Sequence, residues 1–210
     1  AGARLVEEGE RLLEEVRRLQ AKVSTGGPLL GPLTLGATDL VAIYHLPPVL
    51  RRFLKRHPQC ELAVHIEGTA ALIRLLLAGQ CDLALGTLPV EEARVEAIPL
   101  FADPITLVAP PDHPLAKKRR PSAADLGAGT WISHKPDSVT RRQVEGYFAA
   151  QGVRLRVAME ISSPEAIKKL VPARVGLAAL PWCSVRREVR EGRLRVVNPP
   201  GFRLVRGGGG

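Results

Sequence analysis

The sequence predicts an α/β protein whose mostly parallel sheet is covered by helices and divided between two subdomains. Short apolar runs with the period of a strand alternate with segments that have the period of a helix, the order expected for a parallel sheet. A proline-rich break at residues 110–114 separates two such alternating sets. The chain has 210 residues, of which 45% are hydrophobic, and this is enough for one large domain or two small ones.

An amphipathic helix is predicted over residues 1–25, where the segment STGGP at 24–28 provides strong stop signals. Its apolar residues follow a short heptad spacing: Leu5, Leu12, Val16, Leu19 and Val23. A lone helix of this length is marginal in water, so it needs a partner. We expect it to be a dimerisation helix; the alternative is a helix that packs on its own domain.

The first alternating set runs from residue 33 to residue 109. Helices are predicted over 40–56, which ends before Pro58, and over 69–78, which is stopped by Gly79. Strands are predicted, from apolar runs or alternation, at 33–36, 61–66, 82–85, 96–100 and 105–109.

The second set follows the proline-rich break. Ser122 can cap a short helix over 122–126, and Pro164 suits the first turn of another helix. The further helices are predicted at 138–151, 164–171 and 184–191, and the strands at 130–133, 155–161, 176–180, 194–197 and 202–205. The glycines at 207–210 are expected to form a flexible tail.

Known catalytic motifs are missing from the sequence. It contains no Walker loop, no dinucleotide-binding glycine motif at a strand–helix turn and no GxSxG nucleophile elbow. The five histidines lack a metal-ligand spacing, and Cys60, Cys81 and Cys183 are far apart and odd in number. We therefore expect no enzyme activity, cofactor or metal, and free thiols in a reducing cytoplasm.

Membrane insertion is not expected either, because no run of about 18 apolar residues occurs. The first residues carry charges throughout and have no apolar signal-peptide core, although an export signal removed by processing stays an alternative. The many charges and few thermolabile residues would suit a thermophile, although GC-rich codon usage gives the same composition.

Hydroxyl groups and a few other polar side chains gather where predicted strands pass into helices. These candidate ligand-binding residues are Thr38, Asp39, Thr69, Ser133, His134, Ser138 and Ser162. In an open α/β sheet such points meet at the carboxyl edge, where helix N-termini favour small anions. The alternative for any single residue is that it only caps a helix, and for His134 that it is a cleft or surface residue without a catalytic role.

The net charge of +9 favours acidic partners, either DNA or small anions, without choosing between them. The basic run KKRR at 117–120 could contact DNA or a partner, but a solvated loop is the expected interpretation. It lacks the interleaved aromatic residues of a single-strand binder.

Several segments, in unbroken order, resemble the effector-binding domain of LysR-type transcriptional regulators. They are PLTLGA (32–37), LPPVLRRF (46–53), HP (57–58), EGT (67–69), GQCDLAL (79–85), LVAPPDHPLA (107–116) and GLAALP (176–181). No single segment is specific, but the ordered set spans residues 1–206.

The resemblance implies a periplasmic-binding-protein type II architecture with two Rossmann-like subdomains. Subdomain I would hold residues 28–109 plus 182–206, and subdomain II residues 110–181, with a small effector between them. Thr38 and Thr69 match hydroxyl sites of the first subdomain, and Ser133 and the Ser138 region match the second. The helix over 1–25 would be the family's linker helix, which pairs in a dimer or tetramer and joins a DNA-binding head. That head is absent here, so operator DNA would be bound only through it.

Two departures from the family pattern stand out. Arg174 occupies a position where the family usually has a glycine with left-handed backbone, so the turn at Pro172–Arg174 is expected to close differently. The segment after Val205 is short, so the final family helix seems to be missing or replaced by glycines.

A cytoplasmic sensor and oligomerisation domain of a transcriptional regulator is therefore the leading hypothesis. The runner-up is a transport solute-binding protein of the same two-lobed fold, which would carry a signal peptide or a lipid-anchor cysteine. An enzyme would need a catalytic constellation that the sequence lacks. The effector, the target genes and the direction of regulation cannot be read from the sequence.

Overall fold

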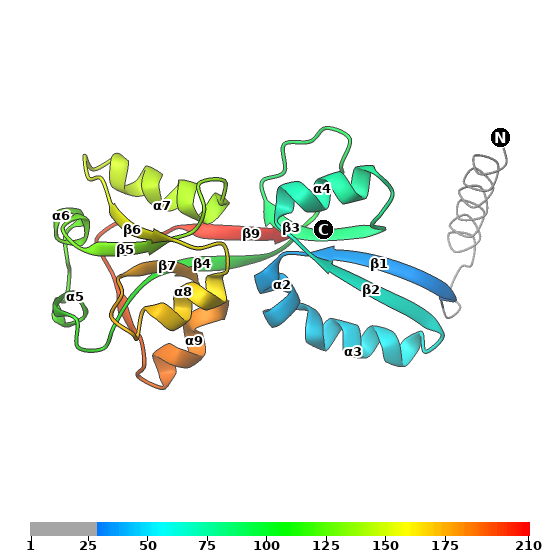
Figure 1. Cartoon of the computed structure of the whole chain (residues 1–210), viewed down its shortest axis with the longest axis horizontal. Coiled ribbons are helices and arrows are strands. Elements are labelled where there is room, and N and C mark those ends of the chain that lie inside the picture. The colour runs from blue at the N-terminus through cyan, green and yellow to red at the C-terminus, as the bar shows by residue number, and fades with distance from the viewer. Residues whose placement is uncertain (1–28) are drawn as a thin grey trace.

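The structure, a computed structural model, describes residues 29–210. The predicted linker helix and its heptad residues lie outside the described residues. Two lobes lie side by side, and two long strands, β4 and β9, run from one lobe to the other (Figure 1). This arrangement confirms the predicted two-lobed α/β architecture.

The first lobe contains three parallel strands covered by helices. Strand β1 lies between β2 and β3 and pairs in parallel with both. The elements are β1 (Gly31–Ala37), α2 (Asp39–Tyr44), α3 (Leu46–Arg56), β2 (Cys60–Ile66), α4 (Thr69–Leu77) and β3 (Leu83–Leu88). The helix predicted over 40–56 is two helices divided at His45, because the prolines after Leu46 lack an N–H and fit only in a first turn.

The second lobe follows the proline-rich break, as predicted. Strands β5 and β6 are parallel, and β5 connects through a bridge from Trp131 to Leu177 with the start of β7. The elements are α5 (Pro114–Lys117), α6 (Ala123–Gly127), β5 (Thr130–Ser133), α7 (Val139–Ala149), β6 (Arg156–Glu160), α8 (Pro164–Leu170), β7 (Ala178–Pro181), α9 (Trp182–Arg190) and β8 (Arg195–Val197).

The strands β4 (Pro99–Ala109) and β9 (Val205–Gly209) carry the chain between the lobes (Figure 1). The two strands predicted at 96–100 and 105–109 are one strand, β4. The sheet has the order β2-β1-β3-β9-β4-β7, and β8 also pairs with β4. Strand β9 runs antiparallel to β3 and β4, because the second crossing returns the chain, so the sheet is mixed where we predicted it to be mostly parallel.

The glycines at 207–210 are not a flexible tail, which corrects the prediction from the sequence. Gly207, Gly208 and Gly209 form the end of β9 between β3 and β4. A Cβ atom at Gly208 would lie 2.1 Å from the ring of Phe101, so only glycine fits where this strand crosses the ring. Glycine permits this close approach, while β-propensity alone argued against a strand.

The boundary between the subdomains also differs from the prediction. We assigned residues 182–206 to the first subdomain, but Val185 of α9 and Leu194 pack in one core with Ile132 and Ile167 of the second lobe. The apolar face of α9 is buried there because α8 and β7 cover it. Within the predicted segment, it is β9 that pairs with a strand of the first lobe, β3.

Arg174 itself adopts the left-handed backbone that a glycine would provide, with φ of 62°. The turn after α8 therefore closes in the way expected for glycine, and the prediction of a different closure was wrong. Arg174 also forms an ion pair with Asp112 on the surface. Among the helices of the described residues, none is long and apolar enough to span a membrane.

Candidate functional site

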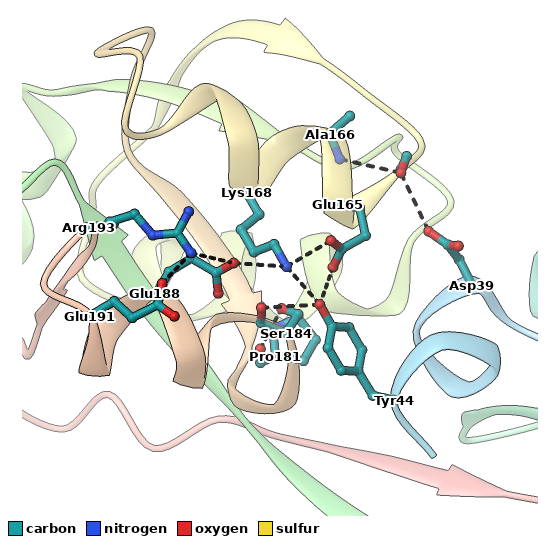
Figure 2. Close-up of polar contacts among 11 residues, drawn as sticks. Asp39, Tyr44, Glu165, Ala166, Lys168, Pro181, Ser184, Glu188, Glu191 and Arg193 are labelled. Atoms are coloured by element: carbon teal, nitrogen blue, oxygen red, sulfur yellow. Dashed lines mark hydrogen bonds and ion pairs between the residues drawn. The ribbon is translucent and has the colours of Figure 1, made fainter. Parts of the chain in front are cut away.

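A polar network joins the two lobes at Tyr44, the last residue of α2 (Figure 2). The Tyr44 hydroxyl donates a hydrogen bond to Glu165 Oε1 at 2.5 Å and accepts one from Lys168 Nζ at 2.7 Å. Glu165 and Lys168 belong to α8 of the second lobe. Lys168 is only 5% exposed and also forms ion pairs with Glu165, at 2.7 Å, and Glu188, at 3.4 Å.

Protonation in this network follows from the same contacts. Burial and the hydrogen bond to Glu165 raise the pKa of Tyr44 to about 12. Burial alone would lower the pKa of Lys168, but the hydrogen bonds to Glu165 and Tyr44 outweigh it and raise this pKa. At neutral pH Lys168 is therefore charged and Tyr44 is a neutral donor.

Asp39, one of the predicted site residues, makes a second contact between the lobes (Figure 2). Ser163 Oγ donates to Asp39 Oδ2 at 3.4 Å and also caps α8 by accepting from the Ala166 N–H. The predicted residue Ser162 is exposed, and its neighbour Ser163 makes the contact instead. The polar pair Ser162–Ser163 signalled the correct turn, but the sequence does not show which hydroxyl turns inward.

The two predicted threonines of the first lobe differ in their surroundings. Thr69, the first residue of α4, accepts a hydrogen bond from the Thr87 N–H at 3.1 Å, which is a structural role. Thr38 precedes α2 but does not cap it through its side chain, and its Oγ1 is buried without a hydrogen-bond partner among the described residues. Thr38 is therefore the better candidate for a ligand contact, since buried hydroxyls are normally paired.

In the second lobe the predicted residues Ser133 and His134 line a small pocket together with Thr140 and Arg141. Ser138 caps α7 through the Arg141 N–H, which is the structural alternative. Arg141, which the sequence analysis missed, donates to the His134 carbonyl at 2.9 Å and pairs with Glu145 and Glu160. The sequence gave no signal for Arg141, because exposed arginines are common in this chain.

His134 is a buried histidine, 7% exposed, with no hydrogen-bond partner for Nε2 among the described residues. Burial lowers its pKa to about 4, although a hydrogen bond with the Ala179 backbone opposes the shift. The positive charges of Arg206 and Arg141 lower this pKa further. His134 is therefore neutral at pH 7, and its free ring nitrogen is an acceptor.

Arg206 and Asp103 face each other across the β4–β9 crossing, as register partners of antiparallel strands. The Arg206 side chain is 7% exposed, its Nη2 lies 3.9 Å from Asp103 Oδ2, and its Nε and Nη2 have no hydrogen-bond partners among the described residues. Burial lowers the pKa of Arg206. Sequence reasoning missed this pair because β9 was not predicted to reach the crossing.

The unpaired atoms define what the region between the lobes can bind. Arg206 and the hydroxyl of Thr38 offer donors, and a guanidinium pairs well with a carboxylate or phosphate. Contacts from both lobes meet the crossing strands, so a ligand held there would affect how the lobes sit. The run KKRR at 117–120 is exposed, and Lys118 pairs with Asp125 within the same lobe.

Comparison with known proteins identifies the family. The model of the LysR substrate binding domain matches residues 26–207. The chain is 35% identical to the HTH-type transcriptional regulator CbbR of Xanthobacter flavus over 98% of the chain, and 29% identical to the RuBisCO operon transcriptional regulator of Allochromatium vinosum over 95%. It spans 62% and 64% of the length of these two relatives.

A solved structure agrees in fold. The CcmR regulatory domain of Synechocystis PCC6803, in complex with 2-PG, superposes with a TM-score of 0.76 at 25% identity, over 85% of each chain. Because the family model covers most of the sequence and the two-lobed fold matches, the chain belongs to the LysR substrate binding domain family.

Proposed function

We propose that this domain binds a small anionic metabolite between its two lobes and thereby controls a LysR-type transcriptional regulator. Operator DNA would be bound by a separate head, and two or four copies would associate in the cytoplasm through the segment before residue 29. A catalytic role is not part of the proposal, because the sequence offers no catalytic motif.

The observation that carries the proposal is the set of buried, unpaired polar atoms on the two lobes and their crossing. Thr38 Oγ1 in the first lobe, His134 Nε2 in the second and the Arg206 guanidinium between them lack hydrogen-bond partners among the described residues. Leaving buried polar groups unpaired is costly, so a ligand that pairs with them would gain their interaction energy. The 2-PG complex of CcmR supports a small ligand in this fold.

An anion is favoured by charge. Arg206 is buried with one acidic neighbour at 3.9 Å, and Arg141 lies under the same edge of the second lobe. A guanidinium offers two parallel donors to a carboxylate or phosphate, whereas a neutral ligand would leave its charge uncompensated.

Thermal unfolding with a ligand panel tests the proposal. The panel contains sulfate, phosphate, 2-PG, shikimate, amino-acid derivatives and dicarboxylic and aromatic acids. A ligand at about 100 times its dissociation constant stabilises the folded state by about 2.7 kcal/mol. We expect at least one anion to raise the melting temperature of the wild-type chain.

Two threonine variants locate the site. Thr38→Val should abolish the shift, whereas Thr34→Val, a matched change in the same strand β1, should retain it. A shift that survives in Thr38→Val would place the ligand elsewhere. A panel without any shift would contradict the anion proposal, and retention of a neutral solute alone would favour the transport solute-binding alternative.

A further inference from the structure

Three potential metal ligands meet at the crossing of the lobes, apart from the atoms used in the proposed function. They are His45 between α2 and α3, Asp103 in β4 and Cys183 in α9. One ligand atom of each lies within 4.8 Å of the other two. The three residues come from separate segments, so no spacing in the sequence predicts the cluster.

The contacts of these side chains leave ligand atoms free. Asp103 is 5% exposed, and its Oδ1 accepts the Cys183 N–H at 3.1 Å, while Oδ2 has no hydrogen-bond partner among the described residues. His45 Nε2 is buried and equally without a partner. The His45 ring stacks on Phe101 with centroids 4.0 Å apart, which holds its plane. Cys183 is 9% exposed.

We propose that His45, Asp103 and Cys183 bind one divalent transition-metal ion of the zinc class. An imidazole, a carboxylate and a thiolate are the ligand types that zinc and cobalt accept in tetrahedral sites. Zinc–ligand distances of about 2.0–2.3 Å place tetrahedral ligand atoms about 3.3–3.8 Å apart, so the side chains must approach each other by about 1 Å. Three protein ligands leave the fourth position open.

Charge balance allows the ion despite two nearby arginines. Binding displaces the Cys183 thiol proton to solvent, so thiolate and the Asp103 carboxylate together offset the charge of a dication. Arg206, which pairs with Asp103 at 3.9 Å, and Arg186, which acts on His45 and Cys183 through its charge, oppose the ion. The Arg206→Gln variant should therefore bind the metal more tightly than the wild-type chain.

The ligands belong to different parts of the fold. His45 lies in the first lobe, Cys183 begins a helix packed in the core of the second lobe, and Asp103 lies in the crossing strand. A bound ion would hold the lobes in the arrangement of Figure 1 whether or not an effector is present. The domain would then respond to a metal as a second, independent input.

Cobalt titration of the reduced, chelator-treated 210-residue chain tests the proposal. Thiolate-bound Co2+ gives a near-ultraviolet charge-transfer band, which should saturate at one equivalent. Cys183→Ser should lose the band, while Cys60→Ser and Cys81→Ser, matched changes of the other buried cysteines, should keep it. His45→Phe should weaken binding by at least about tenfold.

A second measurement does not depend on the folding of a variant. X-ray absorption of the wild-type chain loaded with one equivalent of zinc should show one sulfur ligand at about 2.3 Å among nitrogen and oxygen ligands. A shell without sulfur, an absent cobalt band, or a band that persists in Cys183→Ser would overturn the proposal.

Discussion

Lys168 of α8 donates a hydrogen bond to the hydroxyl oxygen of Tyr44 in α2 at 2.7 Å, and this contact joins the two lobes. Because Lys168 is also paired with Glu165 and Glu188, one buried ammonium connects a phenol of the first lobe to two carboxylates of the second. The arrangement of the lobes therefore depends on few atoms.

Tyr44→Phe removes the hydroxyl that both α8 residues contact. We expect the free energy of unfolding to fall by about 1–2 kcal/mol and the radius of gyration in X-ray scattering to increase. Tyr147→Phe is the matched control, since the Tyr147 hydroxyl bonds the Pro200 carbonyl and not the other lobe. Equal scattering from wild type and Tyr44→Phe would show that this hydroxyl does not set the lobe arrangement.

Lys168→Met leaves Glu188, whose side chain is 8% exposed, without its closest cationic partner. An uncompensated buried carboxylate should lower the free energy of unfolding by about 3–5 kcal/mol in urea denaturation at pH 7. Lys169→Met, the exposed neighbour, should change it by no more than about 0.5 kcal/mol. A small loss in Lys168→Met would mean that water replaces the lysine.

His134 predicts a specific dependence of stability on pH. Its pKa is about 4 in the folded protein and 6.5 in the reference state, so the unfolded chain takes up the proton first as the pH falls. Stability is therefore fully present above pH 6.5 and is lost between 6.5 and 4, by about 3 kcal/mol. His134→Gln should flatten this part of the curve of unfolding free energy against pH; an unchanged curve would refute the assignment.

Gly208→Ala places a Cβ atom against the Phe101 ring, which itself stacks on His45. Overpacking of this kind should cost about 1–3 kcal/mol and lower the melting temperature. At Gly207 the nearest atom, Leu88 Cβ, is 3.3 Å away, so Gly207→Ala should be nearly neutral. Equal effects of the two variants would mean that the end of β9 is not packed as described.

Arg174→Gly should stabilise the chain by about 1 kcal/mol, because φ of 62° is strained for any residue with a Cβ. Arg174→Ala separates this effect from the surface ion pair with Asp112, since it removes the pair but keeps the strain. Chemical denaturation should show a gain for glycine and none for alanine. A gain for both would point to the charge and not to the backbone.

The sequence predicted local elements well because periodicity and stop signals are local. Ser122, Ser138 and Pro164 begin helices where expected, and the first crossing lies at the proline-rich break. It did not predict β9, because a glycine run carries no strand signal and is explained only by the ring of Phe101.

The same limit applies to the site. Thr38, Asp39 and His134 lie near the junction of the lobes, as their positions between strands and helices indicated. Arg206, Asp103 and Tyr44 were missed, because each acquires its role through a residue at least 80 positions away in the chain. Thr69 and Ser138 have the structural hydrogen bonds that the capping alternative allowed, and their ligand role stays a prediction.

The two connections between the lobes are hydrogen-bonded to each other, with Ala102, Asp103 and Pro104 opposite Gly207, Arg206 and Val205. Such a ribbon resists bending within its own plane but yields readily to twisting about its length. The lobes are thus coupled like two plates on one torsion bar, which leaves a single easy coordinate of relative motion. Any molecule captured at the junction can pass on its presence as a rotation, a one-dimensional signal that neighbouring domains can read.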